Sequence, residues 1–270
     1  MKANRRAAFN MIELLVVIGI IALLAGLVLG MLSRARVQHS GVTCASNLRQ
    51  IGQALLLYQN DNRGAYPRTR ASIGPIRAPT WGSSVASTQP FADDGPTEND
   101  VTAALFLLLR TQDITAEVFC CPSSNAEKDQ FGGPAGIPLN RSNFSDIKKN
   151  LSYSYQNPYR NDSAALIGGI SHTTPPNDQF AVASDLNPGV GGRDDVLKIT
   201  TSSSAQELRA GNSNNHDKDG QNILYGDGHV AWESTPFAGV NRDNIYTTAD
   251  GQITASSVDM NDSILLPTDD

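Results

Sequence analysis

The sequence lacks the short motifs that mark several large enzyme classes. Its 270 residues contain no G-x-S-x-G nucleophile elbow, no P-loop and no G-x-G-x-x-G phosphate-binding turn. Cysteine is scarce, and the three cysteines include no C-x-x-C pair, so the sequence does not point to zinc binding or to dithiol redox chemistry. These absences argue against an enzyme, and we expect the protein not to be one.

Basic residues are also few outside the first eight positions. The chain has 21 Lys and Arg against 27 Asp and Glu, and residues 1–8 hold three of the basic residues and no acid. Without that leader, 18 basic residues face 27 acidic ones, and the net charge falls from −6 to −9. An acidic body argues against a nucleic acid partner, because binding phosphates requires basic patches. It is compatible with binding cations, although solubility alone also explains it.

One long apolar run lies near the N-terminus. From Leu14 to Leu32 no residue carries a polar side chain. A helix over residues 9–32 would be about 36 Å long at 1.5 Å per residue, which is enough to cross a hydrocarbon core of roughly 30 Å. Basic residues precede the run, which favours a cytoplasmic N-terminus. We therefore expect a single-pass protein of the cytoplasmic membrane, with a transmembrane helix over residues 9–32 and an exported C-terminal domain.

The start of this run has a specific pattern. Ala8-Phe9 is followed by Glu13 and then by the apolar residues. The run is longer than the ~7–15 apolar residues of a cleaved secretory signal. A plain signal anchor is the remaining alternative, but it does not explain a carboxylate inside an apolar helix. The stretch Ala8–Ala22 resembles the signature of type IV prepilins and type II secretion pseudopilins.

This resemblance implies how the chain is processed. Residues 1–8 would be a leader peptide, removed by a prepilin peptidase that cleaves between Ala8 and Phe9, and the new Phe9 amine would be methylated. The chain departs from the family pattern at two places, where Ala8 replaces the usual Gly and Asn10-Met11 replaces Thr-Leu. These departures imply slower processing.

The same segment has features that suit assembly into a filament. Ala22, Gly26 and Gly30 recur every four residues, so they line one face of the helix and permit close approach of another helix. The resemblance implies that Glu13 pairs with the Phe9 amine of a neighbouring subunit and sets the register between copies. Simple tolerance of glycine in such a helix is the alternative explanation for the small residues.

The rest of the chain indicates an α+β domain. An apolar stripe at helical spacing (Val42, Ala45, Leu48, Gly52, Leu55 and Leu56) predicts an amphipathic helix over residues 33–64. Residues 65–270 would form the exported globular domain, with an irregular loop over 65–100 and a short helix over 101–109 capped by Asp100. Short strands are expected over 152–155 and 180–183. Hairpins are expected around Asp227-Gly228 and Asp250-Gly251, because such turns need positive φ.

A second resemblance covers both ends of this domain. Cys44–Gly52, Cys121-Pro122 and the stretch from His216 to Val230 resemble the prepilin-type processing-associated family with an H-x9-D-G pattern, although ten residues separate His216 from Asp227 here. The resemblance implies a pilin-like fold, in which the long N-terminal helix, half in the membrane, packs on a small antiparallel sheet. It also implies a disulfide between Cys44 and Cys121, with Cys120 as the alternative partner of Cys44.

One polar loop offers candidate calcium ligands. Oxygen-bearing side chains alternate before Gly220, as in the first half of a calcium loop, but the closing Glu is missing. A solvated turn before the hairpin is the alternative. The candidate ligands are Asn215, Asp217, Asp219 and Asp227.

Taken together, these patterns favour a structural subunit of a pilus or of a secretion pseudopilus. Its expected partners are a prepilin peptidase, the membrane, and copies of itself or related pilins. The alternative is a membrane-anchored ligand-binding module that does not polymerise. The sequence does not distinguish a pilus from a pseudopilus, nor a major from a minor subunit.

Overall fold

The computed structural model describes residues 11–72, 78–83, 87–159, 178–191, 195–259 and 261–269. For residues 27–39, inside the first helix, it describes the backbone but not the side chains. The chain divides into two compact units, Met1–Ser40 and Gly41–Asp270, and each is described by itself. Ala8 and Phe9, the expected cleavage site, lie outside the described residues.

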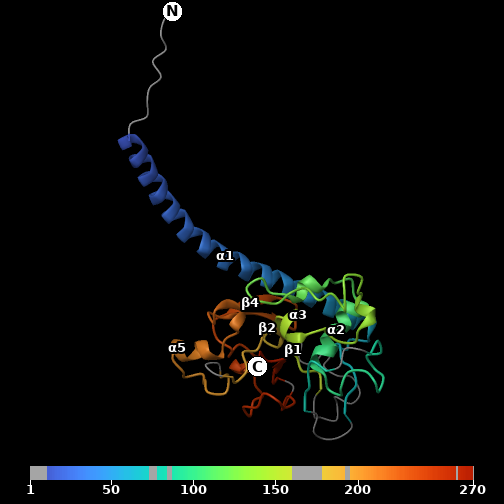
Figure 1. The fold of residues 1–270 in the computed structure, drawn as a ribbon. Helices are drawn as coiled ribbons and strands as arrows, with labels where there is room; N and C mark the ends of the chain where they lie inside the picture. The colour runs from blue at the N-terminus through green and yellow to red at the C-terminus, as the bar shows by residue number, and fades with distance from the viewer. Residues whose placement is uncertain are drawn as a thin grey trace, which may run out of the picture. The chain divides into compact units, whose positions relative to one another are not determined.

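Helix α1 runs from Met11 to Asp61 (Figure 1). The sequence has no proline within it, so every residue keeps the backbone N–H that the helix needs. The helix ends at Asp61, three residues before the predicted end, because Arg63 and Gly64 adopt left-handed backbone conformations with φ of 57° and 83°. The N–H of Gly64 then donates to the carbonyl of Gln59, which satisfies one of the last carbonyls of the helix.

The N-terminal part of α1 differs from the expectation. Among the described residues, no helix combines the length and the apolar character that crossing a membrane requires. The segment of α1 whose side chains are described here, residues 11–26, carries the charged Glu13 in an otherwise apolar sequence. The expected transmembrane helix over residues 9–32, the membrane half of the expected fold and the single-pass membrane localisation are therefore wrong.

In the Gly41–Asp270 unit, α1 packs on the core by one stripe. Its fully buried side chains are Cys44, Leu48 and Ile51, with Leu55 2% exposed. These residues recur at intervals of four and three, so they lie on one face of the helix. The predicted stripe had the right period but included Val42 and Leu56, which are 70% and 46% exposed.

The core of this unit is a five-stranded antiparallel sheet, so the fold is α+β. The strands lie in the order β4-β3-β2-β1-β5. Every residue of β1, β2 and β3 is buried, which makes these the central strands in packing as well as in order. The strands are β1 (Tyr153–Gln156), β2 (Ala181–Asp185), β3 (Gln221–Tyr225), β4 (Val230–Glu233) and β5 (Leu265–Leu266).

Helix α1 comes close to β3 at a glycine. A Cβ built on Gly52 would lie 2.9 Å from Leu224 Cδ1, a separation that real Cβ atoms essentially never show. Because Gly52 has no side chain, the helix can lie closer to the sheet than a larger residue at this position would permit.

One of the two expected hairpins is present. Strands β3 and β4 flank Asp227-Gly228, and Gly228 has φ of 90°, as the turn chemistry requires. Asp250-Gly251 also makes a turn, in which Gly251 donates to the carbonyl of Thr248. No strands flank that second turn, because Ile245 bonds instead to Pro236 and to Leu265.

Short helices lie before and between these strands. Helix α2 is almost wholly buried, and the carboxylate of Asp100 caps its N-terminus by accepting from Ala103 N, as the sequence predicts. The helices are α2 (Val101–Thr111), α3 (Ile147–Asn150) and α5 (Ala205–Leu208), and the 3-10 turns are η1 (Ala116–Phe119), η2 (Pro138–Asn140), η3 (Arg209–Gly211), η4 (Asn214–His216) and η5 (Val240–Arg242).

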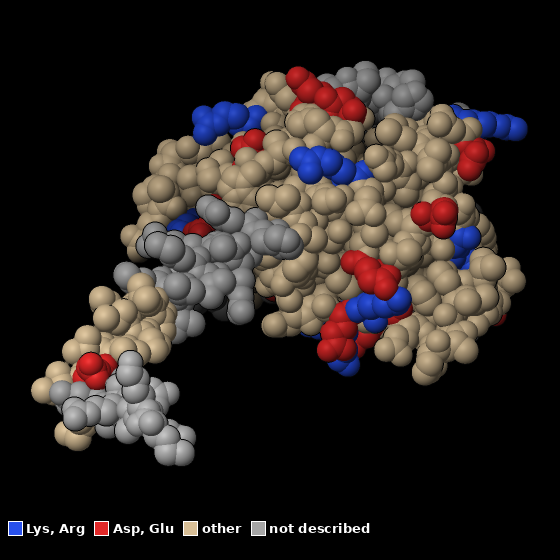
Figure 2. Space-filling model, turned by 90° about the horizontal axis from the view of Figure 1, so that it is seen from above, with Lys and Arg blue, Asp and Glu red and all other residues tan. Residues whose placement is uncertain are grey.

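The surface carries charges of both signs. Figure 2 shows acidic and basic side chains interspersed over one face, most of which is covered by uncharged residues. Several opposite charges on the Gly41–Asp270 unit form exposed pairs, such as Arg209 with Asp219 and Lys128 with Glu117. Pairs of this kind contribute at most about 1 kcal/mol each, so the buried sheet and helices dominate the stability.

Candidate functional site

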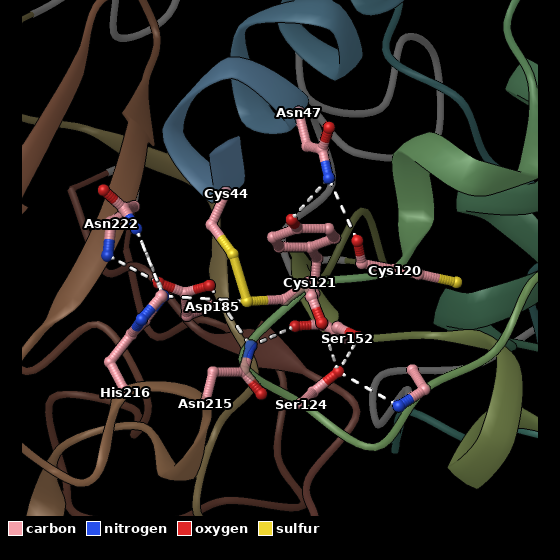
Figure 3. The surroundings of a disulfide bond; sticks show 12 residues. Cys44, Asn47, Cys120, Cys121, Ser124, Ser152, Asp185, Asn215, His216 and Asn222 are labelled. Carbon is pink, nitrogen blue, oxygen red and sulfur yellow. Dashed lines mark hydrogen bonds and ion pairs between the residues drawn. A yellow bond between two sulfur atoms is a disulfide. The ribbon is translucent and has the colours of Figure 1, made fainter. Parts of the chain in front are cut away.

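The disulfide joins helix α1 to the loop that follows η1. Cys44 and Cys121 are bonded, their Cα atoms are 5.3 Å apart, and both side chains are buried. This is the pairing that the sequence resemblance implies. Cys120 is the free cysteine, and its side chain points away from the bond (Figure 3). Burial, with a smaller contribution from Glu117, raises the pKa of the Cys120 thiol to about 11, so it is not an activated nucleophile at neutral pH.

A histidine and an aspartate lie directly beside this disulfide. His216 Nε2 is 3.7 Å from Cys121 Sγ and 3.1 Å from Asp185 Oδ2. The side chain of His216 is 4% exposed and that of Asp185 is not exposed at all. We call these four residues the Cys–His–Asp cluster (Cys44, Cys121, Asp185 and His216), and Figure 3 shows how they converge.

The fold supplies the cluster from four separate segments. Cys44 comes from the buried stripe of α1, and Cys121 comes two residues after the end of η1. Asp185 is the last residue of β2, and His216 is the last residue of η4. The cluster therefore exists only when the sheet, α1 and the loop before β3 are assembled.

The carboxylate of Asp185 is held by fixed hydrogen-bond donors. Its Oδ2 accepts from the backbone N–H of Asn222 at 2.7 Å and from Asn222 Nδ2 at 3.0 Å. Its Oδ1 accepts from Asn215 Nδ2 at 3.2 Å. A buried charged oxygen is costly unless donors replace water, and here protein donors do so. The arrangement fixes the position of the carboxylate next to His216.

The ring of His216 is also held in place. It packs edge-on against Trp232 of β4, with ring centroids 5.3 Å apart. Gly220 makes room for that tryptophan, because a Cβ on Gly220 would lie 2.7 Å from Trp232 Cζ2 and 2.4 Å from the carbonyl oxygen of Glu233. Gly220 was expected to turn a calcium loop, and the structure gives it this packing role instead.

Hydrogen bonds extend from the cluster toward β1 and the loop after Cys121. Asn215 Nδ2 donates to the carbonyl of Ser152 at 2.7 Å, and the hydroxyls of Ser152 and Ser124 are 2.8 Å apart. From α1, Asn47 Nδ2 donates to the carbonyl of Cys120 and to the hydroxyl of Tyr153. The bond from Asn47 to Tyr153 of β1 ties the first helix to the sheet independently of the disulfide.

In the structure, the four candidate calcium ligands have different surroundings and do not share one site. The amide of Asn215 is buried and already bonds to Ser152 and Asp185. Asp219 forms an ion pair with Arg209, and Asp227 accepts from the backbone and the ring of His229. Those bonds, the backbone bond first, lower the pKa of Asp227. Asp217 is exposed in a left-handed conformation with φ of 55°. The calcium site stays a prediction that this geometry does not favour.

The candidate assembly residues lie in the other unit. Glu13, Ala22 and Gly26 belong to the exposed segment of α1, and a Cβ on Gly26 would meet no atom within 4 Å. Gly30 lies in the helix, within the residues whose side-chain surroundings are outside the description.

Sequence reasoning found three members of the Cys–His–Asp cluster but missed Asp185. His216 and the two cysteines were marked by the family resemblance, whereas Asp185 belongs to no recognisable motif. The available signal was its place at the end of a predicted strand, where a charged residue follows the apolar-rich segment 180–183.

Comparisons with protein-family models, with curated proteins and with solved structures found no match for this chain.

Proposed function

We propose that the chain is a structural subunit of a pilus or of a secretion pseudopilus, which assembles with copies of itself through its N-terminal helix. The observation that carries this proposal is the apolar surface of residues 11–26 of α1. Ile12, Ile18 and Leu24 are 68%, 56% and 54% exposed. At 3.6 residues per turn they lie about 120° apart around the helix, so no face of this segment is polar.

A helix that is apolar all round needs apolar partners on every side. Copies of the same helix, packed side by side along a filament, provide such partners. The small residues Ala22 and Gly26 would let neighbouring helices approach closely. The Gly41–Asp270 unit, which has its own buried core, would remain on the outside of the filament.

Glu13 has a defined part in this proposal. It is the one charged residue of residues 11–26, and in an apolar filament core its carboxylate would need a positive partner. The amine of Phe9 in a neighbouring copy, created when a prepilin peptidase cleaves after Ala8, would be that partner.

Glu13→Ala should abolish incorporation into filaments without affecting the fold of the Gly41–Asp270 unit. The experiment is electron microscopy of filament fractions, with intact-mass analysis to show whether the subunits begin at a methylated Phe9. Asp113→Ala, which removes an exposed acid of the other unit, is the matched control and should assemble normally. Normal assembly of Glu13→Ala would contradict the pairing, and filaments lacking this chain altogether would contradict the proposal.

A ligand-binding module that does not polymerise is the second candidate. It is favoured by an open cavity of about 610 Å³ between α2, η1 and the loop near residue 131. Its volume is within the usual range for small-molecule sites, and Leu109, Ile114 and Phe131 contribute apolar walls. A chain that stays monomeric both as wild type and as Glu13→Ala would favour this candidate.

A further inference from the structure

A disulfide does not require ionisable neighbours, yet two buried ones converge on this bond. Desolvating a carboxylate and an imidazole costs free energy that an apolar lining would avoid. Each member of the Cys–His–Asp cluster offers one ligand atom, and all these atoms lie within 4.8 Å of one another. Within the part of the chain that the structure describes, no other group of three or more His, Cys, Asp or Glu side chains lies this close.

The spacing of the ligand atoms suits a tetrahedral ion. With bonds of about 2.3 Å to sulfur and about 2.0–2.2 Å to nitrogen and oxygen, the ligand atoms around zinc lie roughly 3.3–3.8 Å apart. His216 Nε2 is 3.7 Å from Cys121 Sγ and 3.1 Å from Asp185 Oδ2. The two sulfur atoms, which are now bonded to each other, would have to separate, and the ligand atoms that lie up to 4.8 Å apart would have to draw closer.

We propose that the Cys–His–Asp cluster binds one zinc ion when the Cys44–Cys121 disulfide is reduced. Two thiolates, an imidazole and a carboxylate are the ligand types that zinc prefers, whereas calcium takes oxygen ligands only. The disulfide and the metal site exclude each other, because a bonded sulfur pair offers no thiolate. The site would therefore report the redox state of its surroundings.

The residues around the cluster suit a second layer of a metal site. Metal-binding side chains are usually oriented by further hydrogen bonds, and the loss of such bonds weakens metal binding. Asn215 and Asn222 already orient the carboxylate of Asp185, and Trp232 holds the ring of His216. A cleft of about 210 Å³ lies beside this layer and is lined in part by Ser152 and Asn215.

A phosphine can reduce the disulfide before zinc is bound. The phosphine attacks one sulfur and breaks the sulfur–sulfur bond, and water then completes the reaction, giving a phosphine oxide and the two thiols of Cys44 and Cys121. Binding of Zn²⁺ displaces the two thiol protons to solvent. A cellular dithiol would do the same, and it would leave as its own disulfide.

The test compares the purified full chain before and after reduction. A water-soluble phosphine is added, free thiols are counted, and Zn²⁺ is supplied and then removed by desalting. We expect three thiols and one zinc per reduced chain, and one thiol and no bound zinc per oxidised chain. Cobalt(II) in place of zinc should give the intense visible absorption of a tetrahedral thiolate site, a readout that needs no mutation.

Variants assign the ligands. His216→Ala should weaken zinc binding at least about tenfold, while His229→Ala, at an exposed histidine, and Cys120→Ser should bind as the wild type does. A reduced wild-type chain with three free thiols that binds no zinc would overturn the proposal. So would a cobalt spectrum without thiolate bands, or unchanged affinity in a folded His216→Ala chain.

Discussion

The fully buried carboxylate of Asp185 accepts hydrogen bonds from two asparagine side chains and one backbone amide, and His216 Nε2 lies 3.1 Å from it. Each donor is itself held by the fold: Asn222 lies on β3, and His216 and Asn215 lie in η4. Such a carboxylate fixes the relative positions of β2, β3 and the loop before β3. Its removal should therefore affect the whole Gly41–Asp270 unit rather than one local contact.

Asp185→Asn keeps the size of the side chain but replaces one acceptor oxygen by a donor. Because at least one buried N–H then faces another donor, we expect a loss of about 2–4 kcal/mol in the free energy of unfolding. Asp217→Asn changes an exposed acid in the same region and should stay within about 0.5 kcal/mol of the wild type. Urea unfolding of both chains measures the difference, and equal midpoints would show that the carboxylate is not needed.

The functional residues could be predicted only where a local motif marked them. The resemblance identified Cys44, Cys121 and His216, because each lies in a short recognisable stretch. It could not identify Asp185, whose partners come from other strands. The structure does not favour the expected calcium ligands, for the converse reason. Their spacing was suitable, but in the folded chain Asp219 forms an ion pair with Arg209, and Asp227 accepts a hydrogen bond from His229.

At the level of the elements, the buried stripe of α1 determines how the helix meets the sheet. Leu48 is fully buried within the apolar core, whereas Val42 projects from the same helix and is 70% exposed. The sequence assigned both residues to the buried face. Substituting each of these two residues therefore tests whether the helix buries the observed stripe or the predicted one.

Leu48→Ala should lower the free energy of unfolding by about 2–5 kcal/mol, because it leaves a cavity in the core. Val42→Ala, the matched control, should change it by less than about 0.5 kcal/mol. Thermal or urea unfolding of the two variants gives the comparison. Similar losses for both would mean that the helix buries the face that the sequence predicted.

The elements themselves were largely predictable, but their boundaries and partners were not. The capping residue Asp100 marked α2, and Asp227-Gly228 marked the β3–β4 hairpin. The same logic failed at Asp250-Gly251, where the turn exists but its flanks bond to segments distant in sequence. Strand β5 also had no signal, since its pairing with β1 is a long-range contact between two short strands.

For the molecule as a whole, two aspartates near the C-terminus link stability to pH. Burial raises the pKa of Asp243 to about 7 and that of Asp262 to about 6, and neighbouring acids including Asp259 add to both effects. A carboxyl whose pKa is higher in the folded chain holds its proton more tightly there. The folded state is therefore favoured at low pH, and this contribution is lost as the pH rises through about 6–7.

We expect the urea midpoint to rise when the pH is lowered from 8 to 5. Asp243→Asn, which stays neutral and can still accept from the N–H of Ser263, should show a smaller rise than the wild type. Asp113→Asn, at an exposed acid, serves as the control for general charge effects. A rise of the same size in all three chains would assign the pH dependence to net charge instead of to Asp243.

The covalent bond between Cys44 and Cys121 also has a mechanical consequence. A pull transmitted along α1 from its N-terminal end enters the Gly41–Asp270 unit at Gly41 and meets the bond three residues later. The load then passes directly to Cys121, and the chain between the two cysteines, with a sequence separation of 77, is bypassed. That length, about 250 Å when extended, stays folded under tension until the bond is reduced. A chain built this way can bear force through its first helix without extending the segment between the two cysteines.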